Sequence, residues 1–293
     1  MISQTTLAPL KLHRAGKKIG LVLGSGAARG LAHIGVIKVL ERNNIPIDFI
    51  SGSSIGALVG GLYAVTKDIA YIEKLALDTD WLHMVKLFDP SFGSGFLSGD
   101  KVKEFIHKAL HGASFSQCKI PFSVVATDII AGEPVIFYEG DLASAIRASI
   151  SIPFVFHTVL YKGKTLCDGA LSMPVPVSIV KEMGAEYVIA VDLESGYFKG
   201  KHQKLKDNLI DTENNVIMLL TSHLAKENTQ KADLVLDPVW GDVDWASFGS
   251  RKTTADLISR GEKMMEEALP CYFETIKPKS FTKKLKDFLN QPI

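Results

Sequence analysis

The chain has 293 residues, of which 46% are hydrophobic and 22% charged. This length and composition suit one large α/β domain that folds without disulfides or a structural metal. Its 33 Lys and Arg residues balance 32 Asp and Glu residues, for a formal net charge of +1. Near-neutrality excludes the strongly basic character typical of nucleic-acid binding. Three widely spaced cysteines form no zinc or disulfide pattern and predict a reducing, cytoplasmic location.

Strands and helices are expected to alternate after an N-terminal tail at residues 1–16. The pattern predicts buried strands at 19–23 and 47–51, followed by helices at 31–41 and 55–65. A glycine-rich turn separates each strand from its helix. Two strand–turn–helix units in succession predict a right-handed βαβ start and a mostly parallel sheet.

The segment at 81–99 is aromatic and glycine-rich without a clean period, and it predicts a long loop or flap. We find no internal repeat or low-complexity linker. The simplest organisation is one domain at 17–270 followed by a C-terminal segment at 271–293. Beyond the flap the pattern predicts helices at 101–110 and 142–149, and strands at 122–126, 135–138, 187–192 and 234–236.

A G-x-S-x-G pattern, with the sequence GSSIG, lies at 52–56 between the second strand and its helix. A nucleophilic serine on such a turn needs a strained backbone, and the flanking glycines leave room for it. The N-terminus of the following helix also favours negative charge developing beside the serine. The pattern makes Ser54 a candidate nucleophile. The alternative interpretation is a glycine-lined helix cap formed by Ser53 or Ser54.

The other glycine turn, GSGAARG at 24–30, follows the first strand. Arg29 stands where a dinucleotide-binding loop has its third glycine, and the Gly-Lys-Ser/Thr ending of a P-loop is also missing. The turn still offers a row of backbone N–H groups at a helix N-terminus, which can bind a phosphate or an oxyanion. Because adjacent parallel strands end at the same edge of a sheet, we expect both glycine turns to lie close together.

A nucleophilic serine needs a proton acceptor, and three histidines are candidates for this role. His33 lies in the helix after the first glycine turn, where a packing role is the simpler interpretation. His202 and His223 lie downstream among polar residues. Asp168 is the better candidate, because it follows a strand-like stretch, although an Asp-Gly pair alone indicates only a turn.

The order of these motifs resembles the patatin-like phospholipase family, in the bacterial branch similar to the catalytic domain of neuropathy target esterase. A strand leads into the glycine turn, G-x-S-x-G follows, and Asp168 comes 114 residues after Ser54. The resemblance extends over about residues 17–193. It also includes the sequences ATD at 126–128, AIRAS at 145–149, IP at 152–153 and PVPV at 174–177.

The resemblance implies a three-layer α/β/α sandwich with a mostly parallel central sheet, and a Ser–Asp dyad without histidine. In this chain it makes Ser54 the nucleophile and Asp168 the general base. It assigns the oxyanion hole to Gly26, Ala27 and Arg29, with Arg29 holding the loop. The supporting positions of the motifs are Gly24, Ser25, Gly30, Gly52, Gly56 and Gly169.

Two departures from the family's pattern affect loop geometry. The glycine triplet appears as SGA at 25–27, and Asp-Gly-Gly appears as DGA at 168–170. Backbone N–H donors survive both changes, but side chains restrict positive φ angles. An aspartate with an ordinary pKa of about 3.9 is a poor base for a hydroxyl, so Asp168 is expected to be desolvated. The scheme needs no metal and no cofactor.

The family implies a phospholipid or lysophospholipid substrate, hydrolysed through an acyl-enzyme. The segment at 81–99 is expected either to line the entry for the acyl chain or to fold onto the core. The C-terminal segment combines lysines with an apolar helical face, and it predicts either a docked helix or peripheral contact with an anionic membrane. A homodimer stays open.

Two other functions stay open at this point. The first is an acyltransferase on a related fold, which would need a histidine partner such as His202 or His223. The second is a non-catalytic regulatory protein that uses its glycine turns only to bind a phosphate or nucleotide.

Overall fold

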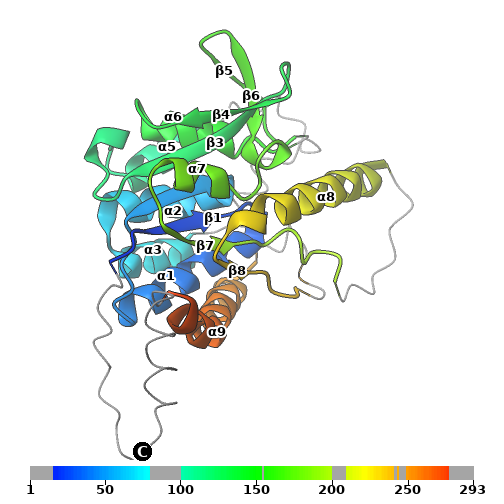
Figure 1. Cartoon of the computed structure of the whole chain (residues 1–293). Helices are drawn as coiled ribbons and strands as arrows, with labels where there is room; N and C mark the ends of the chain where they lie inside the picture. The colour runs from blue at the N-terminus through cyan, green and yellow to red at the C-terminus, as the bar shows by residue number, and fades with distance from the viewer. Residues whose placement is uncertain are drawn as a thin grey trace, which may run out of the picture.

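The computed structural model describes residues 16–79, 100–153, 155–199, 209–240, 243 and 249–276. The expected flap at 81–99, His202 and the basic segment at 278–293 lie outside the described residues. The described part is a three-layer α/β/α sandwich around one central sheet (Figure 1), which confirms the expected fold class.

The described strands form an eight-stranded sheet in the order β5-β6-β3-β2-β1-β7-β8, with β4 paired to β3. Strands β3, β2, β1, β7 and β8 run parallel to their neighbours in this order. Strands β4 and β6 run antiparallel to β3, and β5 runs antiparallel to β6. The strands are β1 (Ile19–Leu23), β2 (Phe49–Ser53), β3 (Phe122–Asp128), β4 (Glu133–Phe137), β5 (Val159–Tyr161), β6 (Lys164–Asp168), β7 (Tyr187–Val191) and β8 (Leu234–Leu236).

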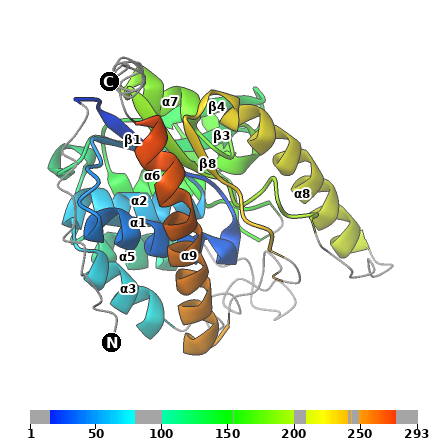
Figure 2. The same ribbon diagram turned by 60° about the horizontal axis from the view of Figure 1, so that its bottom comes forward.

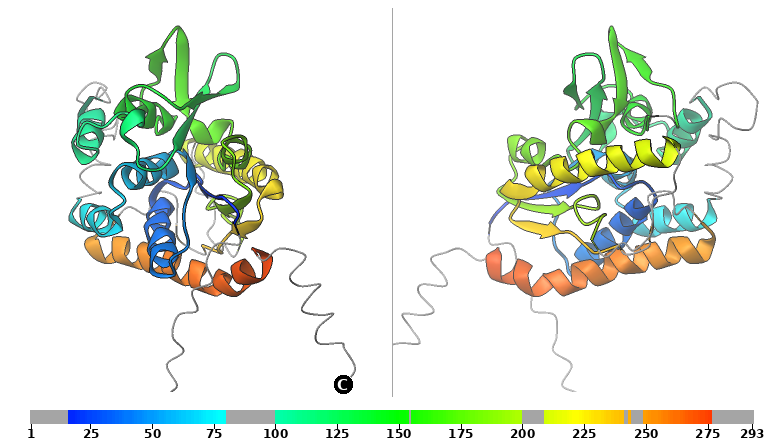
Figure 3. Two further views of the ribbon diagram at one scale, coloured as in Figure 1. Left: turned by 60° about the vertical axis from the view of Figure 1, so that its left-hand side comes forward. Right: turned by 90° about the vertical axis from the view of Figure 1, so that its right-hand side faces the viewer.

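Helices cover both faces of the sheet, and Figure 3 shows α8 and α9 on opposite sides of it. The longer helices on the α9 side pack on one another and on the sheet, whereas α7 packs on β1, β2 and β7 from the other side. The helices are α1 (Ala32–Arg42), α2 (Ile55–Thr66), α3 (Ile69–Asp78), α5 (Asp100–Ala109), α6 (Leu142–Ser149), α7 (Val177–Glu182), α8 (Leu209–Asn228) and α9 (Arg251–Thr275).

Strand alternation explains why the molecule has two apolar layers. All five residues of β1 and all five of β7 are buried, as expected for strands covered on both faces. Leu21 and Leu23 join the larger hydrophobic cluster, which contains residues of α1, α2 and α9. Val22, between them, points the other way into a smaller cluster with residues of α7. The continuous apolar pattern of these strands therefore dictates a helix layer on each side.

Two glycines allow α9 to pack tightly along α1 (Figure 2). A Cβ atom on Gly261 would lie 1.9 Å from the carbonyl oxygen of Ala32, and one on Gly35 would lie 2.0 Å from that of Ile258. Helix α9 continues through Pro270 to Thr275, so the expected boundary at residue 270 falls inside it.

The second strand begins and ends later than the sequence predicts. We expected it at 47–51, but β2 spans Phe49–Ser53 and pairs with both β1 and β3. Pairing extends the strand through Gly52, which is paired with both β1 and β3, and Ser53, which is paired with β3, although neither residue favours strands intrinsically. As a result, Ser54 follows the last strand residue directly.

Candidate active site

The ends of β2 and β6 meet along one edge of β3. Strand β4 occupies the other edge of β3 over 124–128, so β2 and β6 share the remaining edge. Ser53 is opposite Val125, and Asp168 is opposite the next residue, Ala126. Since the two strands point toward each other, the residue after β2 and the last residue of β6 lie together. This topology brings Ser54 to Asp168 across 114 residues of sequence.

Ser54 occupies a strained turn between β2 and α2. Its φ is 54° and its ψ is −125°, an unfavourable conformation for a residue with a side chain. A Cβ atom on Gly52 would lie 2.5 Å from the carbonyl oxygen of Gly56, and one on Gly56 would lie 2.0 Å from that of Leu23. The two glycines of G-x-S-x-G are therefore required by close backbone approach.

The side chain of Ser54 faces Asp168 and does not cap the helix. Ser54 is the N-cap residue of α2, but its hydroxyl makes no capping hydrogen bond. Its Oγ instead donates to Oδ2 of Asp168 at 2.7 Å, and both residues are buried. The capping alternative from the sequence thus fails for Ser54, and a serine–carboxylate pair takes its place.

Asp168 sits where a carboxylate is a stronger base than usual. Its Oδ1 accepts a hydrogen bond from the amide of Ala170 at 2.9 Å. Burial, with a smaller contribution from the charge of Glu194, raises the pKa of Asp168 from 3.8 to about 7, against the hydrogen bonds from Ala170 and Ser54, which lower it. A base with a pKa near neutrality combines an available charged form with a useful affinity for the proton.

The end of α6 holds both members of the pair. The hydroxyl of Ser149 accepts the amide of Ser54 at 2.8 Å and donates to the carbonyl of Val125 at 2.6 Å. Two residues later, the carbonyl of Ser151 accepts the amide of Asp168 at 3.0 Å. Ser149 and Ser151 are fully buried. The amide of Ser54 is therefore occupied, and a reacting oxygen must find its donors elsewhere.

The first glycine turn, at the end of β1, carries further backbone amides on the strand next to β2. The amides of Gly24 and Ser25 are occupied by the carbonyls of Val191 and Pro174. Among the turn and loop hydrogen bonds of the described residues, none involves the amide of Gly26 or Ala27. Ala27 adopts a φ of 47° despite its side chain, so this turn keeps a glycine-like geometry.

Arg29 holds this turn from behind as a buried cation. Its Nε donates to the carbonyl of Gly26 at 3.3 Å, and its Nη2 lies 3.2 Å from Oε2 of Glu194. The hydroxyl of Ser25 donates to the other oxygen of Glu194 at 2.9 Å. The guanidinium carbon also lies 4.7 Å from the ring centroid of Tyr197. The guanidinium group of Arg29 thus contacts the glycine turn and the residues that hold it in place.

Glu194, Tyr197 and Ser149 were missed by the sequence reasoning. Glu194 and Tyr197 follow β7, which lies beside β1 in the sheet. Only a prediction of this strand pairing could have placed the two residues at the glycine turn. Ser149 was visible within the AIRAS sequence at 145–149, but its role depends on the helix end meeting β2.

Neither of the two described histidine candidates, His33 and His223, forms a hydrogen bond with the serine–aspartate pair. His33 is fully buried, and its Nε2–H donates to the carbonyl of Gly24 at 2.7 Å. Burial lowers the pKa of His33 to about 4, against the opposing effect of that hydrogen bond, so the ring is neutral. His223 is exposed on α8. His33 therefore supports the glycine turn, and the carboxylate of Asp168 is the group in contact with the serine.

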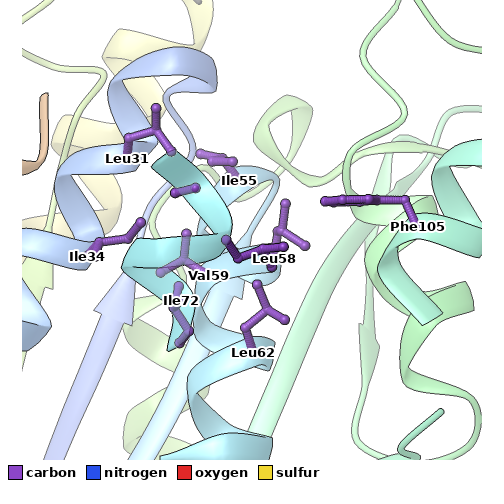
Figure 4. A pocket seen from close by; sticks show the side chains of 10 residues that line it. Leu31, Ile34, Ile55, Leu58, Val59, Leu62, Ile72 and Phe105 are labelled. Atoms are coloured by element: carbon purple, nitrogen blue, oxygen red, sulfur yellow. The ribbon is translucent and has the colours of Figure 1, made fainter. Parts of the chain in front are cut away.

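An apolar pocket lies along α2, the helix that follows Ser54 (Figure 4). Ile55, the residue after Ser54, lies at one end and Leu62 lies two helical turns further along. Seven residues of helix correspond to about 10 Å. The other lining residues come from α2 itself and from the elements around it, and are Leu31, Ile34, Leu58, Val59, Ile72, Leu75, Ala76 and Phe105.

The sequence matches the model of a known family, described as patatin-like phospholipase, over residues 21–181. The chain belongs to this family. The patatin-like segment begins within β1 and contains β2 to β6, both glycine turns, Ser54 and Asp168.

Several relatives carry names from the same family. An uncharacterized NTE family protein of Mycobacterium tuberculosis is 38% identical over 64% of this chain and 52% of its own length. A lysophospholipase of Yarrowia lipolytica, named NTE1, is 35% identical over 62% of this chain and 13% of its own length. The chain thus spans about half the length of the mycobacterial relative. The crystal structure of VipD from Legionella pneumophila has a similar fold, with a TM-score of 0.58, 13% identity and coverage of 87% of this chain and 67% of its own.

The described residues of this patatin-like chain also bear on metal binding and on membrane insertion. No group of three or more His, Cys, Asp or Glu side chains within them could bind a metal ion. None of the helices described is both long and apolar enough to cross a bilayer.

Proposed function

We propose that this chain is a serine acyl hydrolase that cleaves carboxylic esters of lipids with Ser54 and Asp168. The observation that carries the proposal is the 2.7 Å hydrogen bond from Ser54 Oγ to Asp168 Oδ2, made by a strained serine and a buried carboxylate. A structural serine needs neither the strain nor a buried anionic partner.

The first half-reaction forms an acyl-enzyme. Asp168 accepts the hydroxyl proton while Ser54 Oγ attacks the ester carbonyl, and the carbonyl oxygen becomes an oxyanion. The amides of Gly26 and Ala27 donate to this oxyanion, and Arg29 keeps the turn in place through the carbonyl of Gly26. The tetrahedral intermediate then expels the alcohol, which takes the proton from Asp168.

The second half-reaction releases the acid. A water molecule loses a proton to Asp168 and attacks the acyl carbonyl, and the same amides stabilise the second oxyanion. Collapse of this intermediate breaks the bond to Ser54 Oγ, which recovers its proton from Asp168. Both halves need one base that alternates between charged and neutral forms, as a carboxyl with a pKa of about 7 can do.

A fatty acyl ester, as in a phospholipid or lysophospholipid, is the proposed substrate class. The pocket along α2 is lined by aliphatic and aromatic side chains, and it suits a hydrocarbon chain better than a polar acyl group. Relatives named lysophospholipase support the same class. A histidine-dependent acyltransferase is less well supported, because Asp168 occupies the position that its histidine would need.

Ester hydrolysis by matched variants tests the proposal. We expect Ser54→Ala and Asp168→Asn to reduce kcat on acyl esters by about 10³-fold or more. The control Ser53→Ala removes a buried neighbouring hydroxyl that makes no hydrogen bond, and it should keep most of the activity. A fluorophosphonate should label the wild type but not Ser54→Ala. Wild-type turnover by either dyad variant would refute the mechanism, and an unreactive Ser54 would favour a binding protein.

A further inference from the structure

Two β-hairpins extend beyond the catalytic edge of the sheet and form a separate surface (Figures 1 and 3). One is the β3–β4 turn, which carries Ile129 and Ile130, and the other is the β5–β6 hairpin, which carries Leu160, Lys162 and Lys164. We call these five residues the hairpin surface.

Strand pairing holds the two hairpins side by side. The amide of Ile129 donates to the carbonyl of Thr165 at 2.9 Å, and Thr165 is opposite Leu160 in the β5–β6 pair. Directly opposed residues of antiparallel strands point to the same face. Ile129, Thr165 and Leu160 therefore form one row across three neighbouring strands.

The hairpin surface lies on the substrate side of the molecule. Strand β3 runs parallel to β2, so its last residues and the turn after it lie at the edge where Ser54 follows β2. Strand β6 starts at Lys164 and ends at Asp168, and four residues of strand span about 13 Å. The hairpin tips therefore stand beyond the buried dyad, at the edge of the sheet where β2 ends.

Its aliphatic side chains are unusually exposed. Ile130 is 81% exposed and Leu160 is 78% exposed, more than any other large hydrophobic residue in the described part of the chain. A single exposed leucine needs no explanation, but several aliphatic side chains on adjoining tips typically mark an interaction site.

The exposed charges at these tips are two lysines and one acid. Lys162 is exposed at the β5–β6 turn, and Lys164 is 3.5 Å from Asp128, a buried acid at the end of β3. Glu133, opposite Asp128 on β4, is the exposed acid within the two hairpins, at residues 128–133 and 159–168. Aliphatic tips flanked by lysines match a bilayer, because the side chains can enter the hydrocarbon boundary while the cations contact lipid phosphates.

We propose that the hairpin surface docks the protein on a lipid bilayer containing anionic lipid and holds the dyad above it. This inference rests on the proposed function, since a hydrolase of membrane lipids must meet its substrate at a bilayer. The occupant is the lipid surface and not a second copy of the chain. Self-association is one outcome that the test separates.

Vesicle co-sedimentation of the full chain tests this docking. The probe is a vesicle of phosphatidylcholine with phosphatidylglycerol, and the test variant is Ile130→Asp with Leu160→Asp. We expect at least tenfold weaker vesicle binding, because the double variant lacks the two aliphatic side chains whose transfer from water into the bilayer favours binding. Hydrolysis of a soluble short-chain ester should stay within about twofold of wild type, since neither residue touches the dyad.

Lys162→Glu should weaken binding to anionic vesicles and leave binding to pure phosphatidylcholine unchanged.

Val216→Asp is the matched control. Val216 is 51% exposed on α8, away from both hairpins, and this variant should bind vesicles like the wild type. Unchanged sedimentation of the double variant, equal losses in the control, or no vesicle binding by the wild type would each overturn the docking proposal. So would a wild-type dimer that the double variant dissociates without any change in vesicle binding. Failure of the proposed function would look different, because the wild type would then hydrolyse no ester, soluble or vesicular.

Discussion

At the residue scale, the site depends on where buried polar groups find partners. Ser54 can keep a φ of 54° only if its surroundings hold it, and the bond from its amide to Ser149 is one such restraint. Glu194 plays a similar part for the glycine turn, because it binds both Ser25 and Arg29. Residues that never touch the substrate thus define the shape of the residues that do.

Ser149→Ala should slow catalysis, and the loss of stability alone should not account for the effect. Without the hydroxyl, the buried amide of Ser54 loses its partner, which costs about 1–3 kcal/mol and loosens the strained turn. We expect kcat and the rate of fluorophosphonate labelling to fall by about tenfold or more, with a small change in KM.

Ser123→Ala is the control for that experiment. It removes another fully buried serine hydroxyl, which bonds Ser51 Oγ at 2.8 Å within the same sheet. This variant should lose comparable stability and keep its labelling rate. Equal effects of the two substitutions on labelling would show that Ser149 contributes only to the fold.

At the element scale, α2 connects the proposed chemistry with the proposed substrate choice, since it begins directly after Ser54 and its side chains line the pocket. Filling the pocket with Val59→Phe should lower kcat/KM for long-chain esters by about tenfold or more, and leave short-chain esters nearly unaffected. Initial rates across a series of acyl-chain lengths measure this shift. The control Val39→Phe overpacks α1 at a buried position outside the pocket. If both variants give the wild-type chain-length profile, the acyl chain binds elsewhere.

The elements also show how far the sequence could predict the site. The βαβ start, both glycine turns and Ser54 followed from local pattern, because each turn lies between a strand and a helix that are neighbours in sequence. The contact between Ser54 and Asp168 came from family resemblance. Its cause, β6 entering antiparallel at the end of β2, depends on pairing between distant segments. The same holds for Glu194 and Ser149, whose roles arise only when β7 and α6 are in place.

At the scale of the whole molecule, the dyad couples function to folding stability. Asp168 has a pKa of about 7 in the folded chain because it is buried, whereas an exposed aspartate titrates near 3.9. Between these values the folded state keeps a proton that the unfolded state releases. The free energy of unfolding therefore falls as the pH rises from about 4 to 7, in total by roughly 4 kcal/mol, and it does not recover above that range.

Asp168→Asn removes this titration, so its effect on stability should change with pH. At pH 8 the variant should unfold several degrees above the wild type, since it no longer buries a charge, and at pH 4.5 the difference should nearly vanish. Asp128→Asn should behave oppositely. Although burial opposes it, the amides of Ile130 and Ala131 and the charge of Lys164 hold the pKa of Asp128 below its usual value, so losing this carboxylate should lower stability at pH 8. Melting curves of the three proteins at both pH values measure these differences. A pH-independent difference between wild type and Asp168→Asn would mean that Asp168 is ionised at little cost in the fold, and so could not be the near-neutral base on which the mechanism depends.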